Sequence, residues 1–203
     1  MELPGHVGVA LLASLPVAYL LAARDRRQLR GSLAVLLAAA VAPDADLYVA
    51  EIVHRGPTHT VWAALAVGGV LALPALAGYR RRGVDGRAWP RAWTPSSDSV
   101  SDPVGNRRAW FVPAVGVLGV ASHLLGDVLT PMGVRPFAPI VPTTYTLSLT
   151  AAADPVANAA LLTAGVGAFA AALALGRRWG TATATDGDAR YGDGVARVNR
   201  REA

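Results

Sequence analysis

The chain of 203 residues contains no cysteine and no lysine, so that all nineteen of its basic residues are arginine. The absence of cysteine excludes disulfide bonds, iron–sulfur clusters and thiolate zinc sites, and any bound metal must be held by histidine and carboxylate ligands. Charged residues are also scarce, at 16% of the chain, against about 25% in a typical soluble domain. This shortage of charge argues against both a soluble globular protein and a disordered one.

Hydrophobic residues are abundant, at 53% of the chain, and the mean hydropathy is +0.36. They are concentrated in apolar blocks of about 17–22 residues, the length that a helix needs to cross the hydrocarbon core of a bilayer. The sequence therefore predicts an all-α, polytopic membrane helical bundle with about five transmembrane helices. The five expected spans are residues 7–23, 32–50, 59–79, 109–130 and 155–176.

The polar stretches divide the chain further. We expect residues 1–178 to form a membrane-embedded helical domain with a cytoplasmic loop at 80–108, and residues 179–203 to form a polar, disordered tail. A cleaved signal peptide is the alternative interpretation of the first block. The residues before that block carry no positive charge, and arginines follow it, which is the opposite of a secretory signal. We therefore expect the first block to be retained as a span.

The distribution of arginine predicts the orientation in the membrane. With five spans, the connections after the first and third blocks and the C-terminal tail lie on one side, and together they hold 17 of the 19 arginines. Because cytoplasmic segments are enriched in basic residues, we expect a multi-pass cell-membrane protein with its N-terminus outside and its C-terminus in the cytoplasm. These basic loops would suit a regulatory protein or anionic lipid, and we expect no specific nucleic-acid partner.

All four histidines lie near the ends of apolar blocks that this topology places on the outer face. Four acidic residues fall on the same face, although the topology was derived from the arginines alone. Ionisable residues in or beside membrane spans are costly and usually mark a site or a relay. The sequence therefore predicts a polar site at the outer end of the bundle. Its candidate residues are His6, Asp44, Asp46, Glu51, His54, His59, His123 and Asp127.

The spacing of these residues suits metal binding. His123 and Asp127 are four residues apart, so a helix projects both from one face. His54 and His59 flank a Gly-Pro turn, which bends the second imidazole back towards the first. The two aspartates at the end of the second block would share one side only if the chain were extended there. Imidazole and carboxylate ligands without thiolate suit Zn²⁺, Mn²⁺ or Fe²⁺, in one site or a dinuclear one.

Three segments, P-D-A-D (43–46), H-R-G-P-T-H-T (54–60) and S-H-L-L-G-D-V-L-T-P-M-G-V (122–134), resemble a known family. This is the family of LexA-binding, inner-membrane-associated hydrolases, also described as membrane-bound metal-dependent hydrolases. The resemblance extends over most of residues 1–140, and the second and third segments are fairly specific as an ordered pair. Thr60 stands where the family usually has serine, and Pro57 where an apolar residue is more usual. The resemblance implies that the polar centre consists of His6, Asp44, His54, His59, His123 and Asp127.

Two classes of function fit these observations. The first is a membrane-bound metal-dependent hydrolase that uses a divalent metal, Zn²⁺ or Mn²⁺, to act on a lipid-like or phosphoester substrate at the bilayer surface. Asp44 or Asp46 would complete the metal site or act as the general base, and Arg55 and Arg135 would bind an anionic group of the substrate. The second is a non-catalytic membrane protein, either an ion or proton relay or a scaffold that binds a regulator. A conductor would spread polar groups through the depth of the bundle, whereas here they gather at one end.

The predicted orientation can be tested with a reporter fused after Ala203. Because 17 of 19 arginines would then lie inside, a reporter that is active only in the cytoplasm should be active, and one that is active only outside should be silent. The reverse pattern would place the histidine-rich face on the cytoplasmic side.

Overall fold

The structure is a computed structural model that describes residues 1–22, 25–82 and 103–199. Every regular element within these residues is a helix, which confirms the predicted all-α class. The elements are α1 (Leu3–Ala13), α2 (Leu15–Ala22), α3 (Arg26–Val41), the 3₁₀ helices η1 (Ala42–Tyr48) and η2 (Pro57–His59), α4 (Val61–Arg82), α5 (Pro103–Val128) and α6 (Pro155–Asn199).

The first expected span is broken into two helices, α1 and α2, which meet at an angle of 55°. Pro16 lies at the start of α2 and lacks the N–H that a continuous helix would donate to the carbonyl of Leu12. Ser14 satisfies the polar groups at the break. Its N–H donates to the carbonyl oxygens of Ala10 (3.0 Å) and Leu11 (3.2 Å), and its hydroxyl donates to the latter at 2.8 Å.

Among the described residues, three helical segments are long and apolar enough to cross a membrane: Arg26–Tyr48, Trp110–Val128 and Pro155–Trp179. The bent pair of α1 and α2 makes a fourth if it counts as one span. The apolar part of α4, Val61–Pro74, is shorter. The structure thus supports a multi-pass helical bundle, and the expected number of five spans is approximate.

The two ends of the expected domain division differ in what the structure describes. Most of the loop expected at 80–108 lies outside the described residues, since α4 ends at Arg82 and α5 begins at Pro103. Helix α6 continues to Asn199 and so includes most of the segment for which we expected disorder. The chain has no proline after Pro155 to end the helix. The apolar part of α6 nevertheless stops at Trp179, close to the expected boundary.

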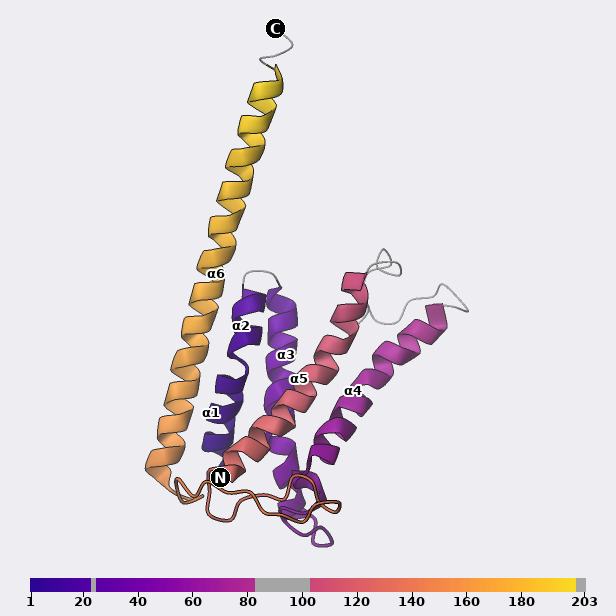
Figure 1. The fold of residues 1–203 in the computed structure, drawn as a ribbon, viewed down its shortest axis with the longest axis vertical. Helices are drawn as coiled ribbons and strands as arrows, with labels where there is room; N and C mark the ends of the chain where they lie inside the picture. The colour runs from indigo at the N-terminus through magenta and orange to yellow at the C-terminus, as the bar shows by residue number, and fades with distance from the viewer. Residues whose placement is uncertain (23–24, 83–102, 200–203) are drawn as a thin grey trace.

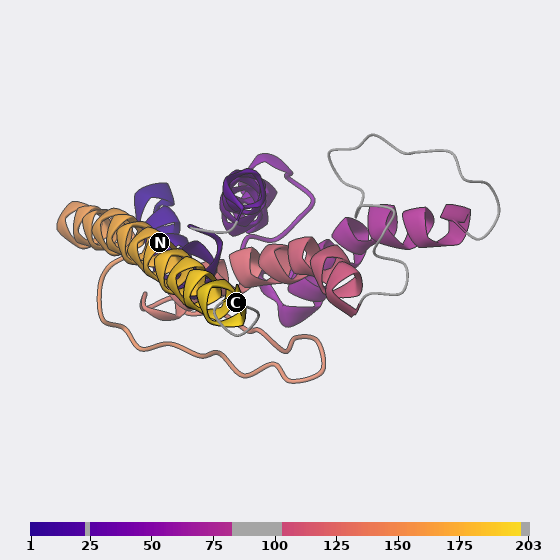
Figure 2. The same ribbon diagram turned by 90° about the horizontal axis from the view of Figure 1, so that it is seen from above.

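The helices stand side by side, so that α1, α4 and α6 begin, and α3 and α5 end, at the lower end of the molecule in Figure 1. The connection from α5 to α6 crosses this same end. Seen from above, α6 lies beside α1 and α2, whereas α4 lies beside α5 (Figure 2). We call the lower end the site end, because every histidine and aspartate of the expected polar site belongs to an element that begins or ends there.

Glycine and alanine let α3 and α5 approach closely just inside the site end. A Cβ atom built on Gly119 of α5 would lie 2.6 Å from the carbonyl oxygen of Leu36 and 2.7 Å from the Cβ of Ala39, both on α3. Leu36 and Ala40 are buried in the adjoining hydrophobic core. This approach of the two backbones brings the last turn of α3 within hydrogen-bond distance of side chains on α5, one helical turn beyond Gly119.

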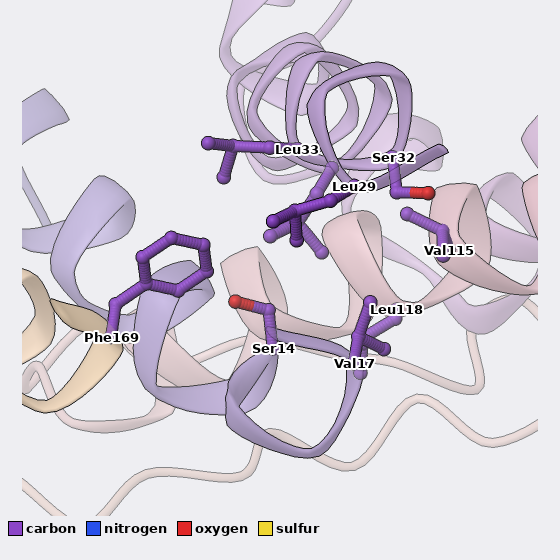
Figure 3. Close-up of a pocket in the computed structure, with 9 residues that line it drawn as sticks. Ser14, Val17, Leu29, Ser32, Leu33, Val115, Leu118 and Phe169 are labelled. Carbon is purple, nitrogen blue, oxygen red and sulfur yellow. The ribbon is translucent and has the colours of Figure 1, made fainter. Parts of the chain in front are cut away.

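A small apolar cavity lies between α1, α2, α3, α5 and α6 (Figure 3). Leucine and valine side chains and Phe169 line it, together with the hydroxyl-bearing Ser14 and Ser32. None of its lining residues is a histidine or a carboxylate. This cavity is therefore separate from the expected polar site.

The close approach at Gly119 predicts the outcome of a pair of substitutions. Gly119→Ala should lower the free energy of unfolding in detergent by about 1–3 kcal/mol, because the new methyl group meets backbone atoms of α3 that cannot move aside. Gly167→Ala on α6 is the matched control, since a Cβ there meets nothing within 4 Å. Denaturant unfolding followed by circular dichroism measures both, and equal stability of the two variants would contradict the packing described.

Candidate metal centre

Helix α5 supplies two of the expected side chains, His123 and Asp127, which are both fully buried. The Nδ1 atom of His123 lies 2.8 Å from the carbonyl oxygen of Ala40, at the end of α3. Because a carbonyl only accepts hydrogen bonds, we assign the ring proton to Nδ1, which leaves a lone pair on Nε2. One helical turn later, the Oδ2 atom of Asp127 lies 3.5 Å from that Nε2 atom, as the i, i+4 spacing predicts.

His59, in η2, presents a second imidazole nitrogen to the first. Its Nδ1 atom lies 2.9 Å from the Thr58 hydroxyl oxygen and 3.3 Å from Oδ2 of Asp46. The Thr58 hydroxyl donates to that same carboxylate oxygen at 2.6 Å, so we assign the His59 ring proton to Nδ1 as well. The Nε2 atoms of His59 and His123 are then 3.0 Å apart. Two buried lone pairs at this distance repel each other unless a proton or a metal cation lies between them.

Two carboxylate oxygens complete a set of four atoms around this point. Oδ1 of Asp44 lies 3.4 Å from Nε2 of His59 and 3.5 Å from Nε2 of His123. Oδ2 of Asp127 lies 3.5 Å from each of the same two nitrogens, and it is buried without a hydrogen-bond partner. We call these four atoms the donor quartet. A tetrahedral site with metal–ligand bonds of about 2.0–2.1 Å separates its ligand atoms by roughly 3.3–3.4 Å, which the quartet matches closely.

His6, near the start of α1, lies beside the donor quartet. Its ring stacks on that of His123, with centroids 3.8 Å apart and planes 10° apart. Its Nε2 atom is 3.6 Å from Oδ1 of Asp127 and 3.8 Å from Oδ2 of Asp44, which are the oxygens that do not belong to the quartet. Both ring nitrogens of His6 are buried without a hydrogen-bond partner, so this imidazole is available as a further ligand.

Asp46 and His54 form a pair at the edge of the cluster. Nδ1 of His54 lies 2.9 Å from Oδ1 of Asp46, and the His54 side chain is 35% exposed whereas that of Asp46 is buried. The other oxygen of Asp46 faces Thr58 and His59. The two aspartates do not share one side of an extended chain, because η1 is a 3₁₀ helix. It directs Asp44 to the Nε2 atoms of the quartet and Asp46 to the Nδ1 atoms of two imidazoles.

Arg55 lies inside the cluster rather than at its surface, with only 9% of the residue exposed. Its guanidinium donates to Oδ1 of Asp127 at 2.8 Å, to the carbonyl of Gly133 at 2.8 Å and to the hydroxyl of Thr130 at 3.2 Å. The backbone of Arg55 has a φ of 58°, a conformation that costs roughly 1–3 kcal/mol for a residue with a side chain. The amino nitrogen of Met1 also contacts Oδ1 of Asp127, at 2.7 Å. Asp127 therefore has positive charge on one of its oxygens only.

Two of the expected residues lie outside the cluster. Arg135 is exposed, and no hydrogen bond or ion pair joins its side chain to the cluster in the part of the chain that the structure describes. Glu51 is also exposed and makes no such contact among the described residues. All the other expected site residues are brought together. Their ligand atoms form two adjoining groups, each within 4.8 Å: His6, His123 and Asp127, and Asp44, His54 and His59.

Three groups in the cluster were not expected from the sequence. Thr58 and Thr130 hold carboxylate and guanidinium groups in place, and both belong to the polar segments already singled out, so their hydroxyls could have been included. The third group is the carbonyl of Ala40 that fixes the His123 ring. It carries no sequence signal, because an alanine in an apolar helix looks the same whether or not its carbonyl has a side-chain partner.

The fold and site together define a multi-pass helical membrane protein with a buried histidine–aspartate cluster at one end of the bundle. A family model described as YdjM inner membrane protein matches residues 1–185, so the chain belongs to this family. This confirms the inner-membrane part of the expected resemblance, and the description names neither a reaction nor a partner. No curated protein and no solved structure matches the chain.

The contacts of the two outer arginines predict different effects on stability. Arg55→Ala should destabilise the protein by about 3–5 kcal/mol, because it leaves the buried Asp127 carboxylate without its side-chain counter-ion. Arg135→Ala should change stability by less than about 0.5 kcal/mol, as is usual for an exposed side chain without a partner. Unfolding of both variants in the same detergent measures the difference. An Arg55 variant as stable as the Arg135 variant would refute the buried ion pair.

Proposed function

We propose that this protein is a membrane-bound, metal-dependent hydrolase that acts on a lipid-like or phosphoester substrate at the bilayer surface. The observation that carries the proposal is the donor quartet, in which the five N···N and N···O distances given above lie between 3.0 and 3.5 Å. Hydrogen bonds within the cluster do not account for this arrangement, because one of the four atoms, Oδ2 of Asp127, is buried and makes none.

The residues that would hold the metal are Asp44, His59, His123 and Asp127, with His6 as a further ligand. Two imidazoles and two carboxylates without thiolate suit Zn²⁺ or Mn²⁺. When bound, such a cation would polarise a phosphoryl or acyl oxygen and acidify a water molecule. The quartet is reached from outside at Asp44, whose side chain is 23% exposed while the other three are buried.

The pair of His54 and Asp46 suits proton transfer. The Asp46 carboxylate accepts the Nδ1 proton of His54, which leaves Nε2 of this half-exposed ring to accept a proton from the attacking water and to return it to the leaving oxygen. All the contacts of Asp46 are to donors that it orients. We therefore assign the general-base role, for which the sequence suggested Asp44 or Asp46, to His54, and assign Asp46 a positioning role.

The two arginines take different roles in this proposal. Arg55 is held by Asp127, so its charge serves the cluster itself. Arg135 follows α5 on the site end, is exposed, and is the only charged residue between Pro131 and Ala153. We assign it the recognition of an anionic substrate group, for which a guanidinium offers paired hydrogen bonds.

A proton relay is the second candidate function. The distance of 3.0 Å between the Nε2 atoms of His59 and His123 is also that of an N–H···N hydrogen bond. A relay across the membrane would need polar groups through the depth of the bundle. Among the described residues, the buried histidines and aspartates lie at the site end alone, which favours the hydrolase.

Metal analysis of the detergent-purified protein tests the proposal. We expect about one or two equivalents of a divalent transition metal, as three to four protein ligands for each ion would hold. His59→Ala and Asp127→Ala should each lower the metal content. Glu51→Gln is the matched control, since it removes an exposed carboxylate at the same end of the molecule and should leave the metal in place.

The result that would overturn the hydrolase is also clear. A protein without bound metal, and without affinity for added Zn²⁺ or Mn²⁺, would leave the proton relay or the regulator-binding scaffold as the better account.

A further inference from the structure

The segment between α5 and α6 has an unusual composition for a connection between transmembrane helices. Residues 131–153 contain a single charged residue, Arg135. Large hydrophobic side chains along the segment are between 40% and 72% exposed. A water-facing loop of this length would leave a large apolar surface uncovered, which is rare and usually marks an interaction site. The exposed side chains are Met132, Phe137, Ile140, Val141, Tyr145, Leu147 and Leu149.

Backbone hydrogen bonds hold this segment against the helix ends. The N–H groups of Leu147 and Leu149 donate to the last carbonyls of the α5 region at 2.7 and 2.8 Å. Val134 and Tyr145 exchange two hydrogen bonds, and the carbonyl of Pro136 accepts from the N–H of Val61 at the start of α4. The apolar side chains are therefore presented by a defined backbone that crosses the site end (Figure 1).

The connection after α3 has the same character at the same end. Leu47 is 60% exposed, Tyr48 90% and Val53 71%. The first two follow Asp44 within the short η1 helix, so apolar surface lies directly beside the exposed edge of the donor quartet. We refer to residues 47–53 and 131–149 together as the outer apolar surface.

We propose that the outer apolar surface lies in the interfacial layer of the membrane and contacts lipid. Lipid is the occupant that the structure favours, because the surface continues the exposed apolar faces of the spans on either side of it. Val156, at the start of α6, is 76% exposed, and Trp62, at the start of α4, is 44% exposed. Tyrosine and tryptophan are typical of this layer, and Tyr48, Trp62 and Tyr145 all lie near the site end.

The backbone of the segment sets its depth. Much of it is neither helix nor closed sheet, and peptide groups without internal partners are not tolerated against hydrocarbon. The segment therefore lies at headgroup depth, where water still reaches its backbone. A consequence, which rests on the proposed hydrolase function, is that the substrate is an amphiphile whose polar group reaches Asp44 from the lipid side.

Single-cysteine labelling tests the depth directly, because the chain has no cysteine of its own. Ile140→Cys and Leu149→Cys would each carry a fluorescent label in the full-length protein, reconstituted in phosphatidylethanolamine and phosphatidylglycerol vesicles. Brominated acyl chains in these lipids should quench both labels. Val166→Cys, on the exposed face of α6, is the lipid control, and Arg27→Cys, at the start of α3, is the water control.

We expect quenching at positions 140 and 149 to be closer to that at position 166 than to that at position 27. Quenching as weak as at position 27, with full access to a water-soluble quencher, would place the segment in water and overturn the proposal. Self-quenching between labels that disappears on dilution with unlabelled protein would show that a second copy covers the surface, which also overturns it. The metal content is measured separately, so failure here is distinct from failure of the metal centre.

Discussion

The structure of the site end depends on two imidazole lone pairs that face each other at 3.0 Å inside the bundle. Each ring is fixed from behind, His123 by the Ala40 carbonyl and His59 by the Asp46 carboxylate. Rotation of either ring would break these bonds in a buried place, where an unpaired polar group costs about 1–3 kcal/mol. The relative positions of α3, α5 and η2 are therefore set by what the two Nε2 atoms hold between them.

The same constraint explains the distribution of charge. Buried carboxylates are costly unless they are paired, and Asp127 is paired on only one oxygen, by Arg55 and the amino nitrogen of Met1. Its second oxygen belongs to the donor quartet and has no hydrogen-bond partner. A cation between the imidazoles would supply the missing partner for that oxygen and for Asp44. It would also separate the two lone pairs, so one ion resolves both unfavourable contacts.

Much of this arrangement could be predicted from the sequence, because its signals are local. Apolar blocks indicated the helices, and the i, i+4 spacing placed His123 and Asp127 on one face. Contacts that depend on tertiary structure could not be predicted. Pro16 lies within an apolar block that looks like one span, the 3₁₀ turn at Asp44 has no distinct pattern, and the inward position of Arg55 requires a left-handed backbone that arginine rarely adopts.

X-ray absorption spectroscopy of the zinc-loaded protein tests the central claim most directly, because it reports the atoms that surround the metal. We expect nitrogen and oxygen ligands at about 2.0–2.1 Å, together with the outer-shell scattering of at least two imidazoles. His123→Ala should remove one imidazole from this pattern. A spectrum with oxygen ligands alone, unchanged by that substitution, would contradict the assignment of His59 and His123 to one shared cation.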